Sequence, residues 1–240
     1  IAKPLGSLGL LEDAVCRLAA VQGTPDVDIS RRICVVMCAD NGVVCEGVTQ
    51  SDSSVTALCA DEIAAGRSSV NVIAASVGAD VIAVDIGVAG DTIALDRKIA
   101  LGTKNIAAGA AMSVSEAEAA IKVGIDLAEQ YSSQGVQIIV TGEMGIGNTT
   151  TAAALTSVLL GVPAGMVTGR GAGLDDARLK HKAEVIEKAI AVNKPDKSKP
   201  VELLAKLGGF DIAGMAGLFL GGAIYRVPVI IDGVISAAAA

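Results

Sequence analysis

Short apolar runs alternate along the chain with turns rich in glycine and aspartate, and this alternation predicts strands followed by helices. Four runs rich in β-branched residues have the length of buried strands, at 33–38, 80–86, 137–140 and 227–231. Helical spacing or small-residue composition predicts helices at 10–22, 55–65, 68–77, 115–130 (with a capping box from Ser115 to Glu118), 174–193 and 201–207, and after the turns at 145–148 and 208–214. The unit of strand, loop and helix recurs at least four times. We therefore predict an α/β fold, a Rossmann-like parallel sheet flanked by helices.

The stretch 136–154 is the centre of this pattern. After the predicted strand, a turn with Gly145, Gly147 and Asn148 leads through Thr149 into an alanine-rich helix. Glycines allow close backbone approach, and a helix N-terminus with free N–H groups attracts anions. The spacing matches neither the dinucleotide GxGxxG pattern nor the Gly-Lys-Ser/Thr phosphate loop. Glu143 lies within the predicted loop, so we expect a ligand with an anionic end and a polar reacting end. The alternative is a tight strand-to-helix connection with a threonine cap.

Two further places on the chain carry candidate chemistry. Asp40 and Asn41 follow the first predicted strand, and open α/β sheets bind ligands at the carboxyl ends of strands. The irregular segment 43–54 after them is a candidate lid or wall. A second glycine-rich loop, 168–173, precedes a basic helix, on which the charge pattern alone predicts exposed positions for His181 and Lys182.

Composition narrows the class of protein. The 240 residues are 52% hydrophobic but only 2% aromatic, with 28 glycines, which is typical of α/β proteins with closely packed helices. The net charge of -7 argues against a nucleic-acid partner but permits a small anion held by one or two local cations. We see no apolar run of membrane-spanning length and no signal peptide, so we expect no membrane contact. The chain has five cysteines, including Cys34 and Cys38, and their spacing is not that of a metal site. An odd number of cysteines among apolar neighbours predicts reduced thiols in a cytoplasmic protein.

Six motifs in order along the chain resemble one family: KPLGSLG, ADNGVV, GEMGIGNTT, GRGAGLDDARLKHK, GGFDIAGMAG and PVIIDGVISAAAA. They are similar to the nicotinate-nucleotide–dimethylbenzimidazole phosphoribosyltransferases. The resemblance implies transfer of the phosphoribosyl group of nicotinate mononucleotide to 5,6-dimethylbenzimidazole, giving α-ribazole 5′-phosphate, the precursor of the lower ligand of cobalamin, and nicotinate. It implies a cytoplasmic homodimer that needs no metal ion or cofactor. It also implies one domain over 1–240, with a smaller lobe built from terminal segments, including residues 1–30.

The resemblance also assigns residues. The donor nucleotide would be surrounded by Gly145, Gly147, Asn148, Thr149, Gly171, Ala172, Gly173 and Lys182. Thr49 and Met144 match positions that line the azole pocket, and Asn41 stands where many relatives have histidine, with an expected effect on which azole is accepted. Glu143 is implied as a catalytic carboxylate. The family's principal base is a glutamate well beyond the DGVIS segment, where this sequence has ended, and the sequence starts at Ile1, so we expect part of a longer chain.

Two other functions are compatible with the residues. One is a different ribosyl-transfer enzyme, such as a nucleoside phosphorylase, in which free phosphate would attack. The other is a protein that binds azoles or nucleotides without catalysis. Restoring the C-terminal segment that carries the family's glutamate would separate catalysis from binding, because a longer chain that is also inert would have binding as its role.

Overall fold

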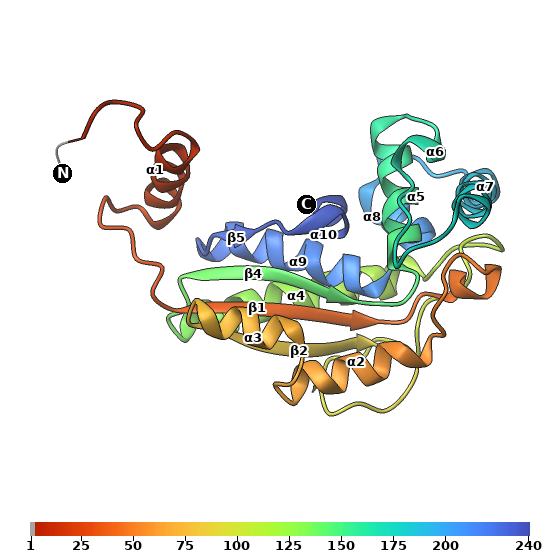
Figure 1. Cartoon of the computed structure of the whole chain (residues 1–240), viewed down its shortest axis with the longest axis horizontal. Helices are drawn as coiled ribbons and strands as arrows, with labels where there is room; N and C mark the ends of the chain where they lie inside the picture. Colours follow the sequence, from red (N-terminus) through yellow and green to blue (C-terminus); the bar gives the residue numbers. More distant parts are fainter. Residues whose placement is uncertain (1–2) are drawn as a thin grey trace.

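The computed structural model describes residues 3–240, and its centre is a five-stranded sheet in which every neighbouring pair is parallel (Figure 1). The strands are β1 (Arg32–Ala39), β2 (Ala79–Gly87), β3 (Leu95–Asp96), β4 (Ile138–Met144) and β5 (Val229–Ile230). Their order is β3-β2-β1-β4-β5. After β3 the chain returns to the other side of β1, so the switch point of the sheet lies between β1 and β4. The predicted Rossmann-like parallel sheet is confirmed. Ligand sites in such sheets lie at the carboxyl ends of the strands beside this switch point.

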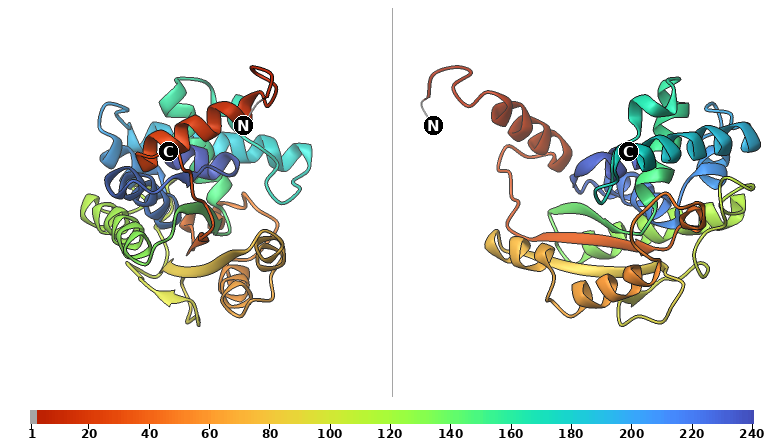
Figure 2. Two further views of the ribbon diagram at one scale, coloured as in Figure 1. Left: turned by 90° about the vertical axis from the view of Figure 1, so that its left-hand side faces the viewer. Right: turned by 45° about the vertical axis from the view of Figure 1, so that its right-hand side comes forward.

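Helices cover both faces of the sheet and its carboxyl end (Figures 1 and 2). One face carries α2 (Ser54–Ala64) and α3 (Ser69–Ser76), which pack on β2, and the other carries α9 (Phe210–Tyr225), which α4 (Val114–Ser133) covers. The remaining helices are α1 (Leu10–Gln22), the 3-10 helix η1 (Gly42–Glu46), α5 (Asn148–Leu160), α6 (Ala164–Val167), α7 (Asp176–Asn193), α8 (Pro200–Leu207) and α10 (Gly233–Ala239). Of these, α5 to α8 gather near the carboxyl ends of the strands.

The side-chain alternation along β1 divides the core into two. Ile33, Val35 and Met37 belong to the large cluster under α9, whereas Cys34 and Cys38 belong to a smaller cluster on the α2 face. The strand is therefore apolar on both faces, as expected for the middle of a parallel sheet. Burial raises the pKa of Cys34 to about 11 and that of Cys38 to about 12, so both remain neutral thiols at physiological pH.

Glycines allow α4 and α9 to pack at backbone contact. A Cβ on Gly124 would overlap the carbonyl oxygen of Gly214 and lie 2.6 Å from the backbone nitrogen of Leu218. A Cβ on Gly217 would overlap the Ile121 carbonyl oxygen in the same way. Small residues of α9 are therefore used in helix packing within the chain.

The N-terminal helix α1 stands apart from the sheet (Figures 1 and 2), and none of its residues is buried. Leu10 and Leu11 are exposed on it, although the helix has the predicted bounds. A small lobe formed by residues 1–30 stays a prediction, as does the division of the chain into domains. Ile1 and Ala2, which fall in that segment, lie outside the described residues.

Several predicted boundaries were wrong for local reasons. The N-cap of α4 is Ser113 rather than Ser115, because the Ser113 hydroxyl and the Glu116 carboxylate form a reciprocal capping box. The segment 43–54, expected to be irregular, begins within the 3-10 helix η1, which spans Gly42–Glu46. The last strand, β5, has two residues rather than five, and the two-residue strand β3 and the four-residue helix α6 were not predicted. Within residues 3–240, no helix is both long and apolar enough to cross a membrane.

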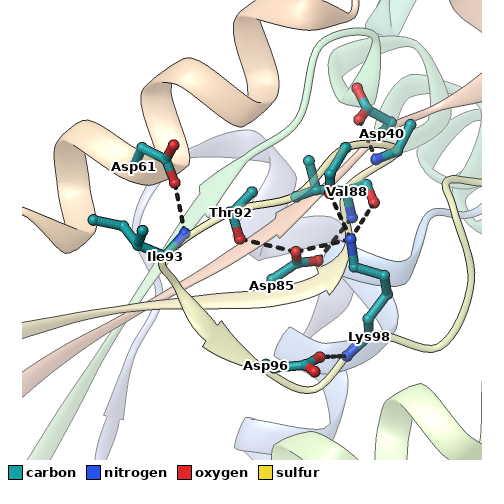
Figure 3. Close-up of polar contacts among 10 residues, drawn as sticks. Asp40, Asp61, Asp85, Val88, Thr92, Ile93, Asp96 and Lys98 are labelled. Carbon is teal, nitrogen blue, oxygen red and sulfur yellow. Dashed lines mark hydrogen bonds and ion pairs between the residues drawn. The ribbon is translucent and has the colours of Figure 1, made fainter.

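A polar network fixes the loop that follows β2 (Figure 3). The buried Asp85 carboxylate accepts hydrogen bonds from the Val88 N–H and the Thr92 hydroxyl, each at 2.9 Å, and pairs with Lys98 at 3.1 Å. The Lys98 ammonium also donates to the carbonyl oxygens of Val88 and Gly90. Asp40 joins the network by accepting from the Ala89 N–H at 2.8 Å. These contacts tie the loop after β2 to the carboxyl ends of β1 and β2, in addition to the buried side chains of Val88 and Ala94.

Candidate active site

The glycine-rich turn after β4 lies against the end of β1, at the switch point of the sheet. A Cβ on Gly145 would overlap the Ala39 carbonyl oxygen and lie 2.7 Å from Asp211 Oδ2. Gly147 has a φ of 93° and is the N-cap of α5, so a side chain there would be strained. Gly145 is therefore required by the close approach of β1 and α9, and Gly147 by its left-handed backbone conformation.

Glu143 is part of the strand rather than of the loop, contrary to the sequence prediction. It lies opposite Met37 in the parallel ladder between β1 and β4, which continues to Met144. Strand pairing thus fixes the backbone of Glu143, and its carboxylate accepts a hydrogen bond from the Asn148 side-chain amide. Burial raises the pKa of Glu143, the Asn148 hydrogen bond opposes this effect, and the nearby Asp232 adds to it.

Lys182 reaches the other side of the same turn from α7. Its side chain is only 1% exposed, which corrects the exposed position that charge pattern predicted. The ammonium donates to Thr149 Oγ1 at 2.7 Å and to the Gly169 carbonyl oxygen at 3.3 Å. No carboxylate of residues 3–240 lies within 4.0 Å of it. Burial lowers the pKa of Lys182 to about 8, so the site holds a buried cation that lacks an anionic partner.

The second glycine-rich loop approaches this lysine. A Cβ on Gly171 would lie 3.2 Å from Thr149 Oγ1 and 3.4 Å from Lys182 Nζ, so the loop backbone passes beside the pair. Ala172 and Gly173 are exposed, and the Gly173 carbonyl oxygen accepts a hydrogen bond from Gln50 at 2.7 Å. The loop therefore forms a wall around the cation and connects it with the segment after η1.

The backbone amides of the turn are less available than the sequence suggested. The N–H of Ile146 donates to Thr56 Oγ1, that of Asn148 to the Gly145 carbonyl and that of Thr150 to the Gly147 carbonyl. Three N–H groups of the expected anion cradle are thus already used. Side chains, above all Lys182, must supply much of any anion binding here.

A cavity of about 340 Å³ opens beside Glu143. It exists because β5 pairs only with Ile139 and Val140, so the last part of β4 has no neighbouring strand on that side among the described residues. Glu143 and Met144 line the cavity, together with residues of α2, the start of α3 and Asp232. Apolar walls with a few polar groups suit a small planar heterocycle. Thr49 does not line this cavity, and its hydroxyl accepts from the Ser51 N–H at 3.3 Å.

Sequence reasoning missed one carboxyl at this site and left another without a role. Asp211, at the start of α9, is fully buried and accepts a hydrogen bond from the Asn148 amide at 2.9 Å. Asp232, recognised only as the residue after the last strand, lines the cavity. The signal available for Asp211 was an acid inside a run of glycines and apolar residues, where a solvated carboxylate would not be expected.

Two residues discussed from the sequence have clear positions. His181 is exposed, as predicted, and its Nε2 lies 2.7 Å from the Glu46 carbonyl oxygen. Asn41 is buried beside the turn, where its Oδ1 accepts from Thr151 Oγ1 at 3.4 Å. Asn41 does not line the cavity, so its expected effect on azole choice would have to be transmitted through the turn.

The switch point of the parallel sheet carries a glycine-rich turn, a buried cation and a buried carboxyl. Together these groups define a candidate site for group transfer from an anionic ligand. A family model described as phosphoribosyltransferase matches residues 1–240, which identifies the class of protein. Relatives from Clostridium acetobutylicum and Acetivibrio thermocellus are 45% and 46% identical over 243 residues. Each alignment covers 100% of this chain and 69% of the relative.

Both relatives are named nicotinate-nucleotide–dimethylbenzimidazole phosphoribosyltransferase, and this chain belongs to that family. A solved structure agrees: CobT from Thermus thermophilus superposes with a TM-score of 0.94 at 37% identity. That comparison covers 100% of this chain and 73% of the other. The resemblance that the six sequence motifs indicated is confirmed.

Proposed function

We propose that this chain transfers the phosphoribosyl group of nicotinate mononucleotide to 5,6-dimethylbenzimidazole, giving α-ribazole 5′-phosphate and nicotinate for the lower ligand of cobalamin. The names of the relatives support this reaction. The observation that carries it is the placement of Asn148 and Thr149, consecutive residues at the start of α5. The first contacts the Glu143 carboxyl and the second contacts the Lys182 ammonium, so one helix turn joins an acid and a cation.

The Lys182 side of the turn fits the donor nucleotide. A 5′-phosphate would give the buried ammonium the anionic partner that it lacks, and Thr149 and Gly171 lie beside it. Gly145, Gly147 and Asn148 would hold the ribose end, with the loop at Gly171, Ala172 and Gly173 closing over it. This assignment rests on the resemblance and on the uncompensated charge of Lys182.

The Glu143 side of the turn fits the acceptor. One azole nitrogen attacks C1′ and forms the new bond, while the bond from C1′ to the pyridinium nitrogen breaks and nicotinate leaves with that electron pair. The configuration at C1′ is inverted. The N–H proton of the azole must then leave, and Glu143 is the carboxyl of this sequence placed to take it. Met144 lines the cavity and would contact the ring. Thr49 does not line the cavity, so the predicted contact between Thr49 and the azole would require the Thr49 side chain to move towards it.

Two broader assignments accompany the reaction. We infer a homodimer from the family resemblance alone. We infer a cytoplasmic location because Cys34, Cys38 and the other three cysteines are all free thiols, as is usual in reducing compartments.

The test is turnover of the parent chain and of Glu143→Gln, measured by mass detection of α-ribazole phosphate and nicotinate. We expect the variant to lose at least about 100-fold in kcat, the range typical of a lost general base. Because burial raises the pKa of Glu143, parent activity should rise as the pH passes above the usual carboxyl range. Glu118→Gln, an exposed carboxyl on α4, is the matched control and should stay within two-fold of the parent. Product formation by Glu143→Gln at the parent rate would refute the role of Glu143. Saturable binding of nucleotide and azole without any product would indicate that the site is built here but that Glu143 is not a sufficient base, as the resemblance implies by placing the principal glutamate beyond the DGVIS segment.

A further inference from the structure

Asp211 is a buried carboxyl to which the proposed reaction assigns no role. Its side chain is 0% exposed, at the start of the helix that packs on the sheet. Oδ1 accepts the Ile212 backbone N–H at 3.0 Å, and Oδ2 accepts from Asn148 Nδ2 at 2.9 Å. Within residues 3–240 no cationic side chain lies within 4.0 Å of it. A buried carboxyl without a cation is unfavourable, so its presence here requires a compensating benefit.

Asn148 connects Asp211 to Glu143 through a single atom. Its Nδ2 donates to Glu143 Oε2 as well as to Asp211 Oδ2, so each of the two amide hydrogens serves one carboxyl. A flipped amide would place its oxygen against two carboxyl oxygens and lose both hydrogen bonds. Asp211 therefore fixes which end of the Asn148 amide faces Glu143.

The backbone leaves space for Asp211 at two glycines. A Cβ on Gly209 would overlap Asp211 Oδ1, and a Cβ on Gly145 would lie 2.7 Å from Oδ2. One glycine precedes α9 and the other follows β4, far earlier in the chain. Any residue larger than glycine at 209 would therefore displace Oδ1 of Asp211, and any residue larger than glycine at 145 would displace Oδ2.

We propose that Asp211 is a positioning residue for the reaction: through the Asn148 amide it holds the Glu143 carboxyl at the cavity, and it forms with Glu143 a carboxyl pair that shares one donor. This inference rests on the proposed function, in which Glu143 takes the azole proton. It adds a group that touches neither substrate and acts only through its neighbours.

The electrostatics of the pair give the inference a measurable consequence. Burial raises the pKa of Asp211 to about 7, the Asn148 hydrogen bond opposes this, and the charge of Glu143 adds to it. Other titratable groups lie on neighbouring elements. Cys38 on β1 is close to both carboxyls, whereas Cys59 and Glu62 on α2 and Asp232 after β5 line the cavity on the Glu143 side only. When Asp211 ionises, Glu143 faces a second negative charge and becomes a stronger base. The rate should therefore rise further across neutral pH.

The experiment follows the Glu143 carboxyl directly, by ¹³C NMR of protein labelled at glutamate Cδ, with the resonance assigned by its loss in Glu143→Gln. In the parent we expect two steps in its titration, the upper one near pH 7. In Asp211→Asn the upper step should disappear. In the same variant, kcat at pH 8 should fall about three- to ten-fold while kcat at pH 6 stays within two-fold, because greater basicity speeds proton transfer. The Kd for nicotinate mononucleotide should change less than two-fold.

Asp85→Asn is the matched control, since Asp85 is also buried at the carboxyl end of the sheet but has no contact with Asn148. It should leave both titration steps of Glu143 in place. A parent curve without the upper step, an upper step that persists in Asp211→Asn, or an equal loss of kcat at pH 6 and pH 8 would overturn the proposal. Should Asp211→Asn fail to fold, Asn148→Ala tests the link instead. In Asn148→Ala the midpoint of the Glu143 titration must move to higher pH, because the hydrogen bond that favours the carboxylate is gone. An unchanged titration midpoint would overturn the proposal.

The two hypotheses fail in different ways. A parent chain that gives no product but shows the two-step titration, lost in Asp211→Asn, would reject Glu143 as a sufficient base for the reaction and leave the carboxyl pair established. A parent chain that gives product through Glu143, with a one-step titration, would reject the pair and keep the reaction.

Discussion

Replacing Lys182 by methionine should make the ligand-free protein more stable while removing its affinity for the nucleotide. The Lys182 ammonium is buried without a carboxylate partner and has two hydrogen bonds, to Thr149 and to the Gly169 carbonyl. Methionine has a similar length and no charge, so it can occupy the same space on α7. The variant therefore separates the unfavourable burial of a charge from the packing of the side chain.

The magnitude follows from the pKa. Burial lowers the pKa of Lys182 from its usual 10.5 to about 8, and each pH unit corresponds to about 1.36 kcal/mol. Burying the charged form thus costs about 3 kcal/mol at neutral pH. The two lost hydrogen bonds oppose this gain by about 1 kcal/mol in total, the low end of their usual net contribution, since the bond to the Gly169 carbonyl is long at 3.3 Å. We expect Lys182→Met to raise the free energy of unfolding by about 2 kcal/mol at pH 7.

The difference should depend on pH with a definite sign. Below pH 8 the lysine is charged in both the folded and the unfolded chain, so the whole cost is present. Between pH 8 and 10.5 the unfolded chain binds a proton that the folded chain does not, and the stability of the parent rises with pH. Above 10.5 the lysine is neutral in both states, and only the lost hydrogen bonds distinguish the variant. The advantage of Lys182→Met should therefore vanish over this window.

Urea unfolding followed by circular dichroism from pH 7 to 10.5 measures both quantities. Lys180→Met is the control, because Lys180 lies on the same helix with its side chain 80% exposed, and its replacement should change stability by less than about 0.5 kcal/mol. Saturating nicotinate mononucleotide should stabilise the parent and Lys180→Met but not Lys182→Met. A Lys182→Met protein that is less stable than the parent at pH 7, by an amount that does not change up to pH 10.5, would refute the reasoning.

Two stability predictions concern the frame around the site. Gly124→Ala should lower the free energy of unfolding by about 2–4 kcal/mol in urea titrations, because the new Cβ forces α4 and α9 apart and this outweighs a helix-propensity gain of about 1 kcal/mol. Gly165→Ala in α6, where a Cβ meets nothing within 4 Å, should not destabilise, and equal losses in both variants would contradict the explanation. Lys98→Met should cost about 2–3 kcal/mol and speed proteolysis of the loop 88–98, because Asp85 loses its cation in a buried position. If Lys98→Met leaves the urea midpoint and the digestion pattern unchanged, the network of Figure 3 does not hold the loop 88–98 in place.

Local patterns predicted much of the fold. The helix at 10–22 has its predicted bounds, and the strands predicted at 33–38 and 80–86 extend by only one residue at either end. Each of these segments has either a uniform apolar run or a clear helical period, and turn residues lie near its two ends. Residues that are close in sequence are therefore enough to decide its structure. The motifs that carried the family resemblance are also local in sequence.

Long-range pairing decided what the sequence did not predict. Glu143 is a strand residue only because β1 continues beside it, and β3 consists of two residues that pair with β2 at Val84 and Asp85. Lys182 was predicted to be exposed because helix periodicity describes the helix by itself, whereas the loop at 169–171 and α5 bury this residue. Asp211 was missed since its partner Asn148 precedes it by 63 residues.

The start of α5 shows why the acid and the cation share one turn. The positive end of a helix dipole stabilises nearby negative charge and disfavours positive charge. Glu143 and Asp211 bond to Asn148 at this end, and Lys182 bonds to the next residue, Thr149. The lysine thus lies in an unfavourable field, and among residues 3–240 no carboxylate within 4.0 Å balances its charge. A phosphate bound beside Thr149 would balance it, so the buried charge lowers the stability of the protein and favours an anionic donor at this site.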